Sequence, residues 1–272
     1  MGTVDLHLHS NASDGVLAPG ELVRVAAGTG LSVISITDHD TVAGIPEALA
    51  AAKVAGIRVI PGVEISTDHK GVQAHILGYF VDYESDAFLA RLDSFRLARL
   101  ERANRILGKL DTLGIVLPRE TVSDADEVGV VGRPHIARAM IAHGYVDSME
   151  EAFGRYLSPG QQAYIPRAKL TPAEAIGMIR AAAGLPVLAH PWSLTYLLDD
   201  LADKGLVGLE VYYRDYDACQ VGRLSRIAKE MGLVRTGGSD FHAMDGGPTD
   251  LGQANVPERC VQELDELRNR LR

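Results

Sequence analysis

The segment Asp5-Leu6-His7-Leu8-His9-Ser10 alternates apolar residues with imidazoles close to the beginning of the chain. Successive side chains of a β-strand point to opposite faces, so we expect His7 and His9 on the same face. Two imidazoles on one face, at the end of a short apolar run, can supply half of a metal site. A single His-x-His pair also arises by coincidence, so the metal prediction depends on what the rest of the chain adds.

Short apolar runs alternate with helical patterns over much of the chain. Helices are expected where proline and glutamate open a pattern and glycine closes it, as at 19–28, and again up to residue 55, at 172–183 and at 216–231. Strands are expected at 3–8, 31–36, 57–60, 72–80, 186–189, 206–212 and 233–236. Seven strands that mostly alternate with helices predict an α/β fold with a barrel-like parallel sheet.

The region from about residue 83 to 169 has a different pattern. Apolar residues between Phe88 and Leu110 have the spacing of a long amphipathic helix, and shorter helical patterns follow at 134–143 and 148–157. Four arginines lie on the other faces of the long helix, and we interpret them as a solvated surface: Arg96, Arg99, Arg102 and Arg105. No strong strand pattern occurs here, so we expect an α-helical insert in the barrel.

Composition excludes several classes of function. The 272 residues carry a net charge of −9, which argues against binding of long duplex nucleic acid through its phosphates. No apolar run approaches the ~18 residues of a membrane span, and the chain enters a strand without a signal-peptide pattern. The two cysteines, Cys219 and Cys260, match no zinc or redox spacing. We therefore expect a cytoplasmic protein that binds no membrane, and a small anionic substrate remains compatible with this composition.

Nine polar side chains fall at or just beyond the ends of the expected strands. In a (β/α) barrel the carboxyl ends of the strands share one rim, where functional residues collect. Six of the nine histidines occupy such positions, whereas random placement would scatter them over helix surfaces as well. The nine residues are His7, His9, Asp14, His39, Glu64, His75, His190, Asp240 and His242.

This set of donors predicts a centre with more than one metal ion. Imidazoles and carboxylates without thiolates suit Mn²⁺, Fe²⁺ or Zn²⁺, and nine ligands are enough for two or three ions, with Mn²⁺ as the favoured metal. Clustered cations would make the pocket locally positive. Each close charge pair contributes about 4 kcal/mol at an effective dielectric of 20. The electric field of the clustered cations would therefore outweigh the diffuse net negative charge of the protein and attract a phosphate.

Six motifs, in this order, resemble those of the polymerase-and-histidinol-phosphatase (PHP) family. They are Asp5-Leu-His-Leu-His9, Thr37-Asp-His-Asp40, Gly62-Val-Glu64, Ala74-His75, Ala189-His-Pro191 and Gly238-Ser-Asp-Phe-His242. The resemblance implies a distorted (β/α)7 barrel formed by residues 1–82 and 170–272, with an α-helical insert at 83–169 that caps the active site. It also implies three ion sites: His7, His9, Glu64 and Asp240; a bridging Glu64 with His75 and His190; and Asp14, His39 and His242.

Within that family, the insert resembles that of the nucleoside 3′,5′-bisphosphate phosphatases. The matching segments are Arg133-Pro-His135, Phe153-Gly-Arg-Tyr-Leu157-Ser-Pro-Gly160 and Tyr164. The resemblance implies that Arg133, His135 and Arg155 contact substrate phosphate, for which a guanidinium fork is suited. The chain departs from the relative at Gly154, where that relative has a second basic residue, and at Trp192, where it has glycine. Trp192 is therefore either a packing residue or a wall for a nucleobase.

The favoured hypothesis is a metal-dependent phosphatase that removes the 3′-phosphate of a nucleoside 3′,5′-bisphosphate such as pAp through attack by a metal-bridging hydroxide. The nearest alternative is a 5′-to-3′ exoribonuclease acting on short 5′-phosphorylated RNA. A histidinol-phosphate phosphatase and a non-catalytic PHP module are less favoured.

The sequence also contains carboxylates close to the nine donors. Asp5, Asp38 and Asp40 flank ligands, and we expect them to hydrogen-bond imidazole N–H groups, with helix capping as the alternative for Asp40. Glu210 is interpreted as a structural carboxylate, with a place on the rim as the alternative.

Overall fold

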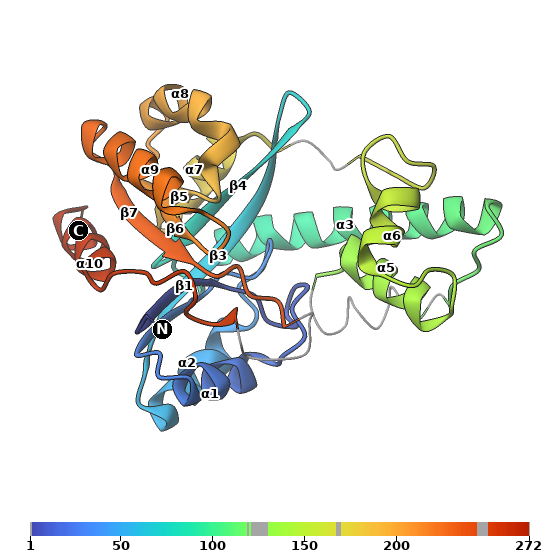
Figure 1. Cartoon of the computed structure of the whole chain (residues 1–272), viewed down its shortest axis with the longest axis horizontal. Coiled ribbons are helices and arrows are strands. Elements are labelled where there is room, and N and C mark those ends of the chain that lie inside the picture. Colours follow the sequence, from blue (N-terminus) through green and yellow to red (C-terminus); the bar gives the residue numbers. More distant parts are fainter. Residues whose placement is uncertain (1, 119, 121–129, 167–169, 244–249, 272) are drawn as a thin grey trace.

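The computed structural model describes residues 2–118, 120, 130–166, 170–243 and 250–271. Its centre is a seven-stranded sheet in which the strands follow one another in chain order, and it curves into a nearly closed barrel (Figure 1). The strands are β1 (Val4–Leu8), β2 (Val33–Ile36), β3 (Arg58–His69), β4 (Val72–Tyr79), β5 (Leu185–Leu188), β6 (Gly208–Tyr213) and β7 (Val234–Gly238).

The first and last strands meet, which brings the two ends of the chain to one site. Leu8 and Phe241 form a parallel bridge, and the His9 N–H donates to the Phe241 carbonyl over 2.9 Å. A Cβ atom on Gly238 would lie only 2.3 Å from the His7 Cβ, so glycine is required at this close approach. The barrel therefore places the His-x-His segment of β1 directly beside the residues that follow β7.

One strand departs from the predicted parallel sheet. β4 is antiparallel to both β3 and β5, whereas the other neighbouring pairs are parallel. Only Lys70 and Gly71 separate β3 from β4, with φ values of 54° and 93°. Such a two-residue turn makes a hairpin, because a parallel neighbour would need a crossover of about a dozen residues. The prediction of seven strands is confirmed, and the parallel direction is wrong for β4.

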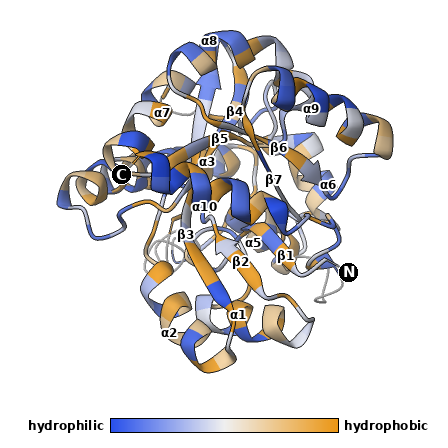
Figure 2. Ribbon diagram, turned by 90° about the vertical axis from the view of Figure 1, so that its left-hand side faces the viewer, coloured by the Kyte–Doolittle hydropathy of each residue, from blue (hydrophilic) through white to orange (hydrophobic). Residues whose placement is uncertain are grey.

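A layer of helices covers the outside of the sheet. Val4, Leu6 and Leu8 of β1 belong to buried apolar clusters with these helices, while His7 and His9 alternate with them. In Figure 2 the strands β2 and β3 are largely hydrophobic, and long hydrophilic segments of α9 and α10 face outward. The helices are α1 (Pro19–Gly28), α2 (Ile45–Ala55), α7 (Pro172–Ala181), α8 (Leu198–Asp203), α9 (Ala218–Glu230) and α10 (Arg259–Leu271); a 3₁₀ helix spans Pro191–Leu197.

The described part of 83–169 is helical and extends away from the barrel (Figure 1). Its elements are α3 (Asp86–Thr112), α5 (Arg133–Ala142), α6 (Met149–Ala152) and a π-helix at Phe153–Leu157. The first turns of α3 pack on the barrel core through Phe88 and Leu92, and its later turns join a separate apolar cluster with α5 and α6. None of the described helices combines the length and the apolar character that a bilayer span needs.

The solvated-surface interpretation of the α3 arginines is wrong for two of them. Arg99 and Arg102 are only 8% and 7% exposed, whereas Arg105 is exposed. Both buried arginines lie where α3 leaves the barrel and meets the rest of the insert. Helical periodicity places a residue on a face, but it does not show what packs against that face.

Candidate metal centre

The structure brings all nine predicted metal-ligating residues together at one end of the barrel. Three groups have possible ligand atoms within 4.8 Å of one another. The groups are His7, His9, Glu64 and Asp240; His9, Asp14, His39 and His242; and His39, Glu64 and His75. His190 joins them through its Nε2, which lies 3.4 Å from Glu64 Oε1. Strand β1, the β3–β4 hairpin and the residues that follow β7 supply donors from far apart in the chain.

Glu64 lies at the middle of this centre. Its Oε2 is 2.9 Å from His39 Nδ1, 3.3 Å from His9 Nε2 and 3.4 Å from His7 Nε2. Its Oε1 lies within hydrogen-bond distance of His75 Nδ1, at 2.9 Å. Glu64 and His75 occupy the interior of long strands, not strand ends as the sequence suggested. The antiparallel hairpin explains this, because it brings the early part of β4 to the same rim as Glu64.

Asp14 and Asp240 flank Glu64 on the same rim. Asp14 Oδ1 is 3.2 Å from His242 Nε2, and Asp14 Oδ2 is 4.0 Å from His39 Nε2. Asp240 Oδ1 is 3.1 Å from His9 Nε2 and 3.4 Å from His7 Nε2. His39 thus faces one carboxylate with each ring nitrogen, so neighbouring groups share donors.

The donor atoms of the centre are close together, but many lack hydrogen bonds. Within the described part of the chain, six of these buried atoms have no hydrogen-bond partner: His7 Nε2, His9 Nδ1, His9 Nε2, His39 Nδ1, His75 Nε2 and Glu64 Oε2. Leaving buried polar atoms unpaired is costly, and it is rare in native proteins. Donors about 2.1 Å from a common cation lie roughly 3.0–3.4 Å from one another, which is the spacing seen here. The residues present therefore fit divalent metal ions, and the absence of thiolates favours Mn²⁺, Fe²⁺ or Zn²⁺.

The charges of the metal-free centre are strongly coupled. Burial lowers the pKa of His9, but the nearby carboxylates of Asp240 and Glu64 raise it to about 10. Burial also lowers the pKa of His7, but the charges of Glu210, Asp240 and Glu64 together hold it well above its ordinary value. Burial would raise the pKa of the Glu64 carboxyl, but the surrounding imidazoles hold it well below its ordinary value. Cations would thus meet ionised carboxylates and would displace protons from imidazoles.

Two residues of β6 support the donors from outside. Glu210 is fully buried and lies 2.9 Å from His7 Nδ1, and it also accepts from the His190 backbone N–H over 2.6 Å. The Tyr213 hydroxyl donates to Asp240 Oδ2 over 3.1 Å. Residues three apart in a regular strand face opposite sides, but the register of β6 shifts between Glu210 and Tyr212, which lets both side chains reach the centre. The sequence analysis left Glu210 undecided and did not identify Tyr213, because a bulge has no clear sequence signal here.

The roles expected for the flanking aspartates are wrong. Asp5 accepts from the backbone N–H groups of Ser239 and Gly252, so it joins the ends of the chain. Asp38 accepts from the backbone and hydroxyl of Ser10 and from the Ser13 hydroxyl. Asp40 pairs with Arg99 and accepts from the Ser66 N–H, and the N-cap of α2 is Gly44 instead. The three aspartates hold loops in place, and the outer carboxylate that contacts a ligand imidazole is Glu210, which lies 2.9 Å from His7 Nδ1.

The insert approaches the centre through the first turns of α5. Arg138 donates to the Asp14 carbonyl, and His135 is close enough for the charge of Asp14 to raise its pKa against the larger lowering by burial. Arg133 begins α5, donates to the Leu157 carbonyl over 3.0 Å and is partly buried. His135 is thus near the rim, whereas the printed contacts of Arg133 lie within the insert. Arg138 is a basic residue near the rim that the sequence analysis did not select.

The third predicted substrate contact is placed differently. The Arg155 side chain is 57% exposed, forms an ion pair with Glu151 one turn earlier and lies against the Tyr156 ring. Among the described contacts, none joins Arg155 to the nine donors or to Arg133. Arg133 and His135 thus share the first turn of α5, Arg155 lies in a surface ion pair, and a role of these three residues in phosphate binding stays a prediction.

Comparison with known proteins agrees with this geometry. A family model for the PHP domain matches residues 5–157. The chain is 33% identical to a 3′,5′-nucleoside bisphosphate phosphatase from Chromobacterium violaceum, over 100% of this chain and 98% of that protein. It is 40% identical to a 5′-3′ exoribonuclease from Haemophilus influenzae, over 88% of this chain and 89% of that protein.

A solved structure supports the same conclusion. A candidate metal-dependent phosphoesterase from Bifidobacterium adolescentis superposes with a TM-score of 0.87 at 33% identity, covering 96% of this chain and 94% of that one. The family match, the relatives and the fold agree with the cluster of metal-binding side chains at the barrel rim. The chain belongs to the PHP domain family and is a metal-dependent phosphoester hydrolase.

Proposed function

We propose that this enzyme removes the 3′-phosphate of nucleoside 3′,5′-bisphosphates such as pAp. The observation that carries the proposal is the juxtaposition of nine metal donors with the basic first turns of α5, where Arg138 touches the Asp14 loop. A monophosphate needs only the metal centre, whereas a bisphosphate also needs a basic group for its second phosphate. The full-length similarity to a bisphosphate phosphatase supports this choice.

The nine donors would hold two or three divalent ions, with Mn²⁺ as the proposed metal. Such ions make water nucleophilic near neutral pH and offset charge on the phosphoryl oxygens. The side chains fix the geometry: Glu64 sits between the donor groups, and Glu210 orients the His7 ring through Nδ1. Tyr213 constrains Asp240 in the same way. This support matters because misplaced ligands weaken both metal affinity and the positioning of substrate.

A 5′-to-3′ exoribonuclease is the second candidate, and one feature of the structure favours it. Aromatic rings follow one another outward from the centre, with centroid distances of 5.9 Å from His190 to Tyr213, 5.1 Å from Tyr213 to Tyr216 and 6.4 Å from Tyr216 to Trp192. Trp192 is 37% exposed at the end of this row. Exposed aromatic rings stack on bases of single-stranded nucleic acid, so the row could accommodate a nucleotide beyond the scissile bond.

Parallel assays on two substrates distinguish the candidates. The Mn²⁺-loaded protein is incubated with pAp and, separately, with a short 5′-phosphorylated RNA labelled at its 3′ end. We expect inorganic phosphate and 5′-AMP from pAp, with little shortening of the RNA. Rapid release of mononucleotides from the RNA without phosphate release from pAp would favour the exoribonuclease. If neither substrate reacts, the proposed substrate class is wrong.

A further inference from the structure

The helical insert contacts the metal centre at two loops of the barrel. Arg99 of α3 reaches the turn after β2, where it pairs with Asp40, the residue that follows the predicted ligand His39. Arg138 of α5 reaches the loop after β1, where it donates to the backbone carbonyl of the predicted ligand Asp14. Each arginine thus contacts the chain beside a metal donor instead of the donor atoms themselves.

The turn that carries His39 has a backbone conformation that needs outside support. Asp40 has a φ of 55°, in the left-handed region that residues other than glycine seldom adopt. Such a conformation persists only where the surrounding structure holds it. The Asp40 N–H donates to the Glu64 carbonyl over 2.9 Å, and Asp40 Oδ1 accepts from the Ser66 N–H over 2.8 Å. Strand β3 thus holds the turn from one side.

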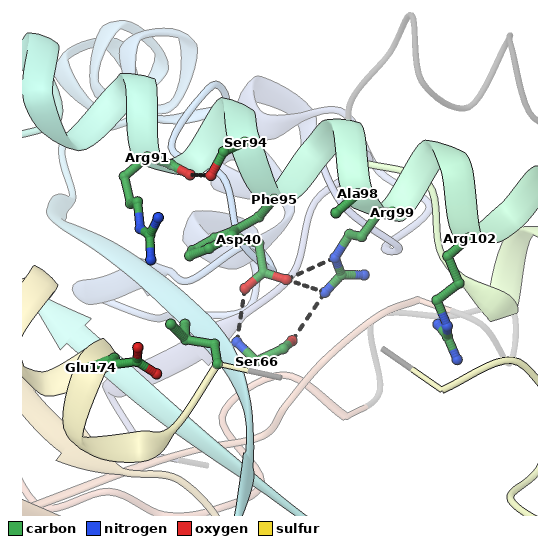
Figure 3. Close-up of a pocket in the computed structure, with 10 residues that line it drawn as sticks. Asp40, Ser66, Arg91, Ser94, Phe95, Ala98, Arg99, Arg102 and Glu174 are labelled. Carbon is green, nitrogen blue, oxygen red and sulfur yellow. Dashed lines mark hydrogen bonds and ion pairs between the residues drawn. The ribbon is translucent and has the colours of Figure 1, made fainter. Parts of the chain in front are cut away.

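Arg99 holds the same turn from the other side (Figure 3). Its Nε donates to Asp40 Oδ2 over 2.7 Å, its Nη2 donates to the same oxygen, and Nη2 also donates to the Ser66 hydroxyl over 3.0 Å. Both charged partners are buried. Removal of one partner from a buried ion pair leaves the other charge uncompensated. The orientation of the His39 turn therefore depends on the position of α3 against the barrel.

The loop that carries Asp14 is held by the insert through its backbone. Arg138 donates to the Asp14 carbonyl, and the Val130 N–H donates to the Ala12 carbonyl over 3.0 Å. The Asp14 side chain faces the centre, with its Oδ1 3.2 Å from His242 Nε2. Hydrogen bonds from the insert thus fix the backbone just before and at this ligand.

The two ligands that the insert supports belong to one group of donors. Asp14 and His39 share this group with His9 and His242, and the ligand atoms of all four lie within 4.8 Å of one another. Side chains that bind a metal keep their affinity only when the groups around them hold them in the right orientation. Two of these four donors therefore depend in part on contacts with the insert.

Another group of donors has its outer support within the barrel. Glu210 of β6 lies 2.9 Å from His7 Nδ1, and the Tyr213 hydroxyl donates to Asp240 Oδ2. The members of this group are His7, His9, Glu64 and Asp240. The centre thus combines one group that the barrel supports with one that also needs the insert.

We propose that Arg99 and Arg138 are positioning residues for the ion that Asp14 and His39 would help to hold. The affinity for this ion then depends on the packing of the insert, whereas the affinity for the ion at His7 depends on the barrel. Coupling of this kind is reciprocal, so the ion also favours the docked position of the insert. This inference rests on the proposed occupancy by two or three ions and is independent of the proposed substrate.

A manganese titration tests the role of Arg138. Mn²⁺ is added in steps to the metal-free, full-length protein, and electron paramagnetic resonance measures the unbound ion, which gives an affinity for each equivalent bound. We expect Arg138→Gln to weaken one equivalent by about tenfold or more and to leave the others unchanged. Arg105→Gln, at an exposed position of α3, should match the wild type. Unchanged binding, or equal weakening of every equivalent, would overturn the proposal.

A double variant shows whether the arginine and the barrel support different ions. Glu210→Gln removes the charge beside His7 Nδ1 and should weaken an equivalent that the barrel supports. In the variant that combines Arg138→Gln with Glu210→Gln, we expect two weakened equivalents. Arg138→Lys keeps a donor for the Asp14 carbonyl and should recover part of the lost affinity. A double variant with a single weakened equivalent would contradict the assignment.

Hydrogen–deuterium exchange of α5 detects the reciprocal effect without any measurement of activity. Mn²⁺ loading should slow amide exchange in Arg133–Ala142 of the wild type, and it should slow exchange less in Arg138→Gln. A purely structural role of Arg138 would instead raise exchange by the same factor with and without Mn²⁺. Wild-type exchange that does not respond to Mn²⁺ would refute the coupling.

Arg99→Gln tests the second contact, with thermal unfolding recorded because the variant leaves Asp40 uncompensated. We expect the folded variant to bind Mn²⁺ with at least one weakened equivalent, and wild-type Mn²⁺ binding by it would remove Arg99 from the proposal. Phosphate release from pAp by the wild type is measured separately. Selective weakening by Arg138→Gln together with no hydrolysis of pAp would uphold this inference and refute the proposed function.

Discussion

The metal centre and the junction of α3 with α5 both bury nitrogen atoms without hydrogen-bond partners, yet they present opposite charges. At the centre, the ionised carboxylates of Asp14, Glu64 and Asp240 lie among imidazole nitrogens that lack hydrogen-bond partners. At the junction lie the guanidinium groups of Arg102 and Arg133, and Arg102 Nη2 is buried without a hydrogen-bond partner in the described part of the chain. The first arrangement fits cations, whereas the second leaves positive charge without a carboxylate partner among the described residues.

The two regions also differ in what holds them. Apart from Asp14, which lies in the loop after β1, the donors belong to β1, β3 and β4 or lie within four residues of the ends of β1, β2, β5 and β7. Backbone hydrogen bonds of the barrel fix these strands. The arginines belong to helices of the insert and reach their positions through long side chains. Most of the centre is accordingly fixed by the barrel, with Asp14 also contacted by Arg138 of the insert, whereas the buried arginines depend on the packing of the insert.

Removal of the central carboxylate should have the largest effect. Glu64 faces donors of all the proposed ion sites. Loss of an outer partner of a metal ligand costs about 10- to 100-fold in activity, and Glu64→Gln should lose more than this. Phosphate release under saturating Mn²⁺ measures this. Glu230→Gln, at an exposed position on α9, is the matched control. A Glu64→Gln enzyme with near-normal turnover would show that Glu64 does not join the sites.

The Asp40–Arg99 pair should be the strongest ionic contribution to stability. Asp40→Ala leaves Arg99 buried without its partner, and we expect the free energy of unfolding to fall by about 3–5 kcal/mol. Asp265→Ala breaks the exposed pair with Arg58 and should cost about 1 kcal/mol or less. Urea denaturation of both variants gives the comparison. Equal losses would mean that the buried pair contributes no more than a surface one.

The carboxylate behind His7 should have a smaller effect on the centre. Glu210→Gln keeps the shape of the side chain but removes the charge beside Nδ1, and we expect metal affinity to fall by about 10- to 100-fold. Competition with a chelator of known affinity measures the change. Activity should recover at high Mn²⁺ concentration, unlike that of Glu64→Gln. Wild-type metal affinity would mean that Glu210 only supports the His190 backbone.

Metal binding should depend on pH in a definite direction. The raised pKa values of His7 and His9 mean that both rings hold an extra proton in the metal-free protein at pH 7, whereas Asp14, Glu64 and Asp240 are already ionised. Cations bind neutral imidazole, so affinity should rise with pH, by about tenfold per pH unit for each proton displaced. Calorimetry in buffers of different ionisation enthalpy counts the released protons. Metal affinity that is constant between pH 6 and 8 would contradict this.

The metal centre was largely predictable from the sequence, and the reason is geometric. Strand periodicity places His7 and His9 on one face, and polar residues after later strands must meet at the same rim. The direction of β4 was the error there, although Lys70-Gly71 is a tight turn that could have indicated it. That error left the donors unchanged, because the hairpin carries His75 to the same rim.

The burial of Arg99 and Arg102 on α3 was not predictable in this way. Arg99 and Arg102 have the spacing of an ordinary solvated helix face, and the partner of Arg99 lies 59 residues earlier in the chain. The roles of Asp5, Asp38 and Asp40 were missed for the same reason, since each contacts a segment distant in sequence. Periodicity shows which residues share a face, but contacts between elements decide which charges are buried.

Elemental analysis of the full-length protein tests the central claim most directly. Wild-type protein and the Glu64→Gln variant are loaded with Mn²⁺, dialysed against metal-free buffer and analysed in parallel. The account predicts two or three equivalents of metal in the wild type, fewer in the variant, and no phosphate release from the wild type once a chelator has removed the metal. Wild-type protein that retains no metal while still releasing phosphate in the presence of chelator would contradict it.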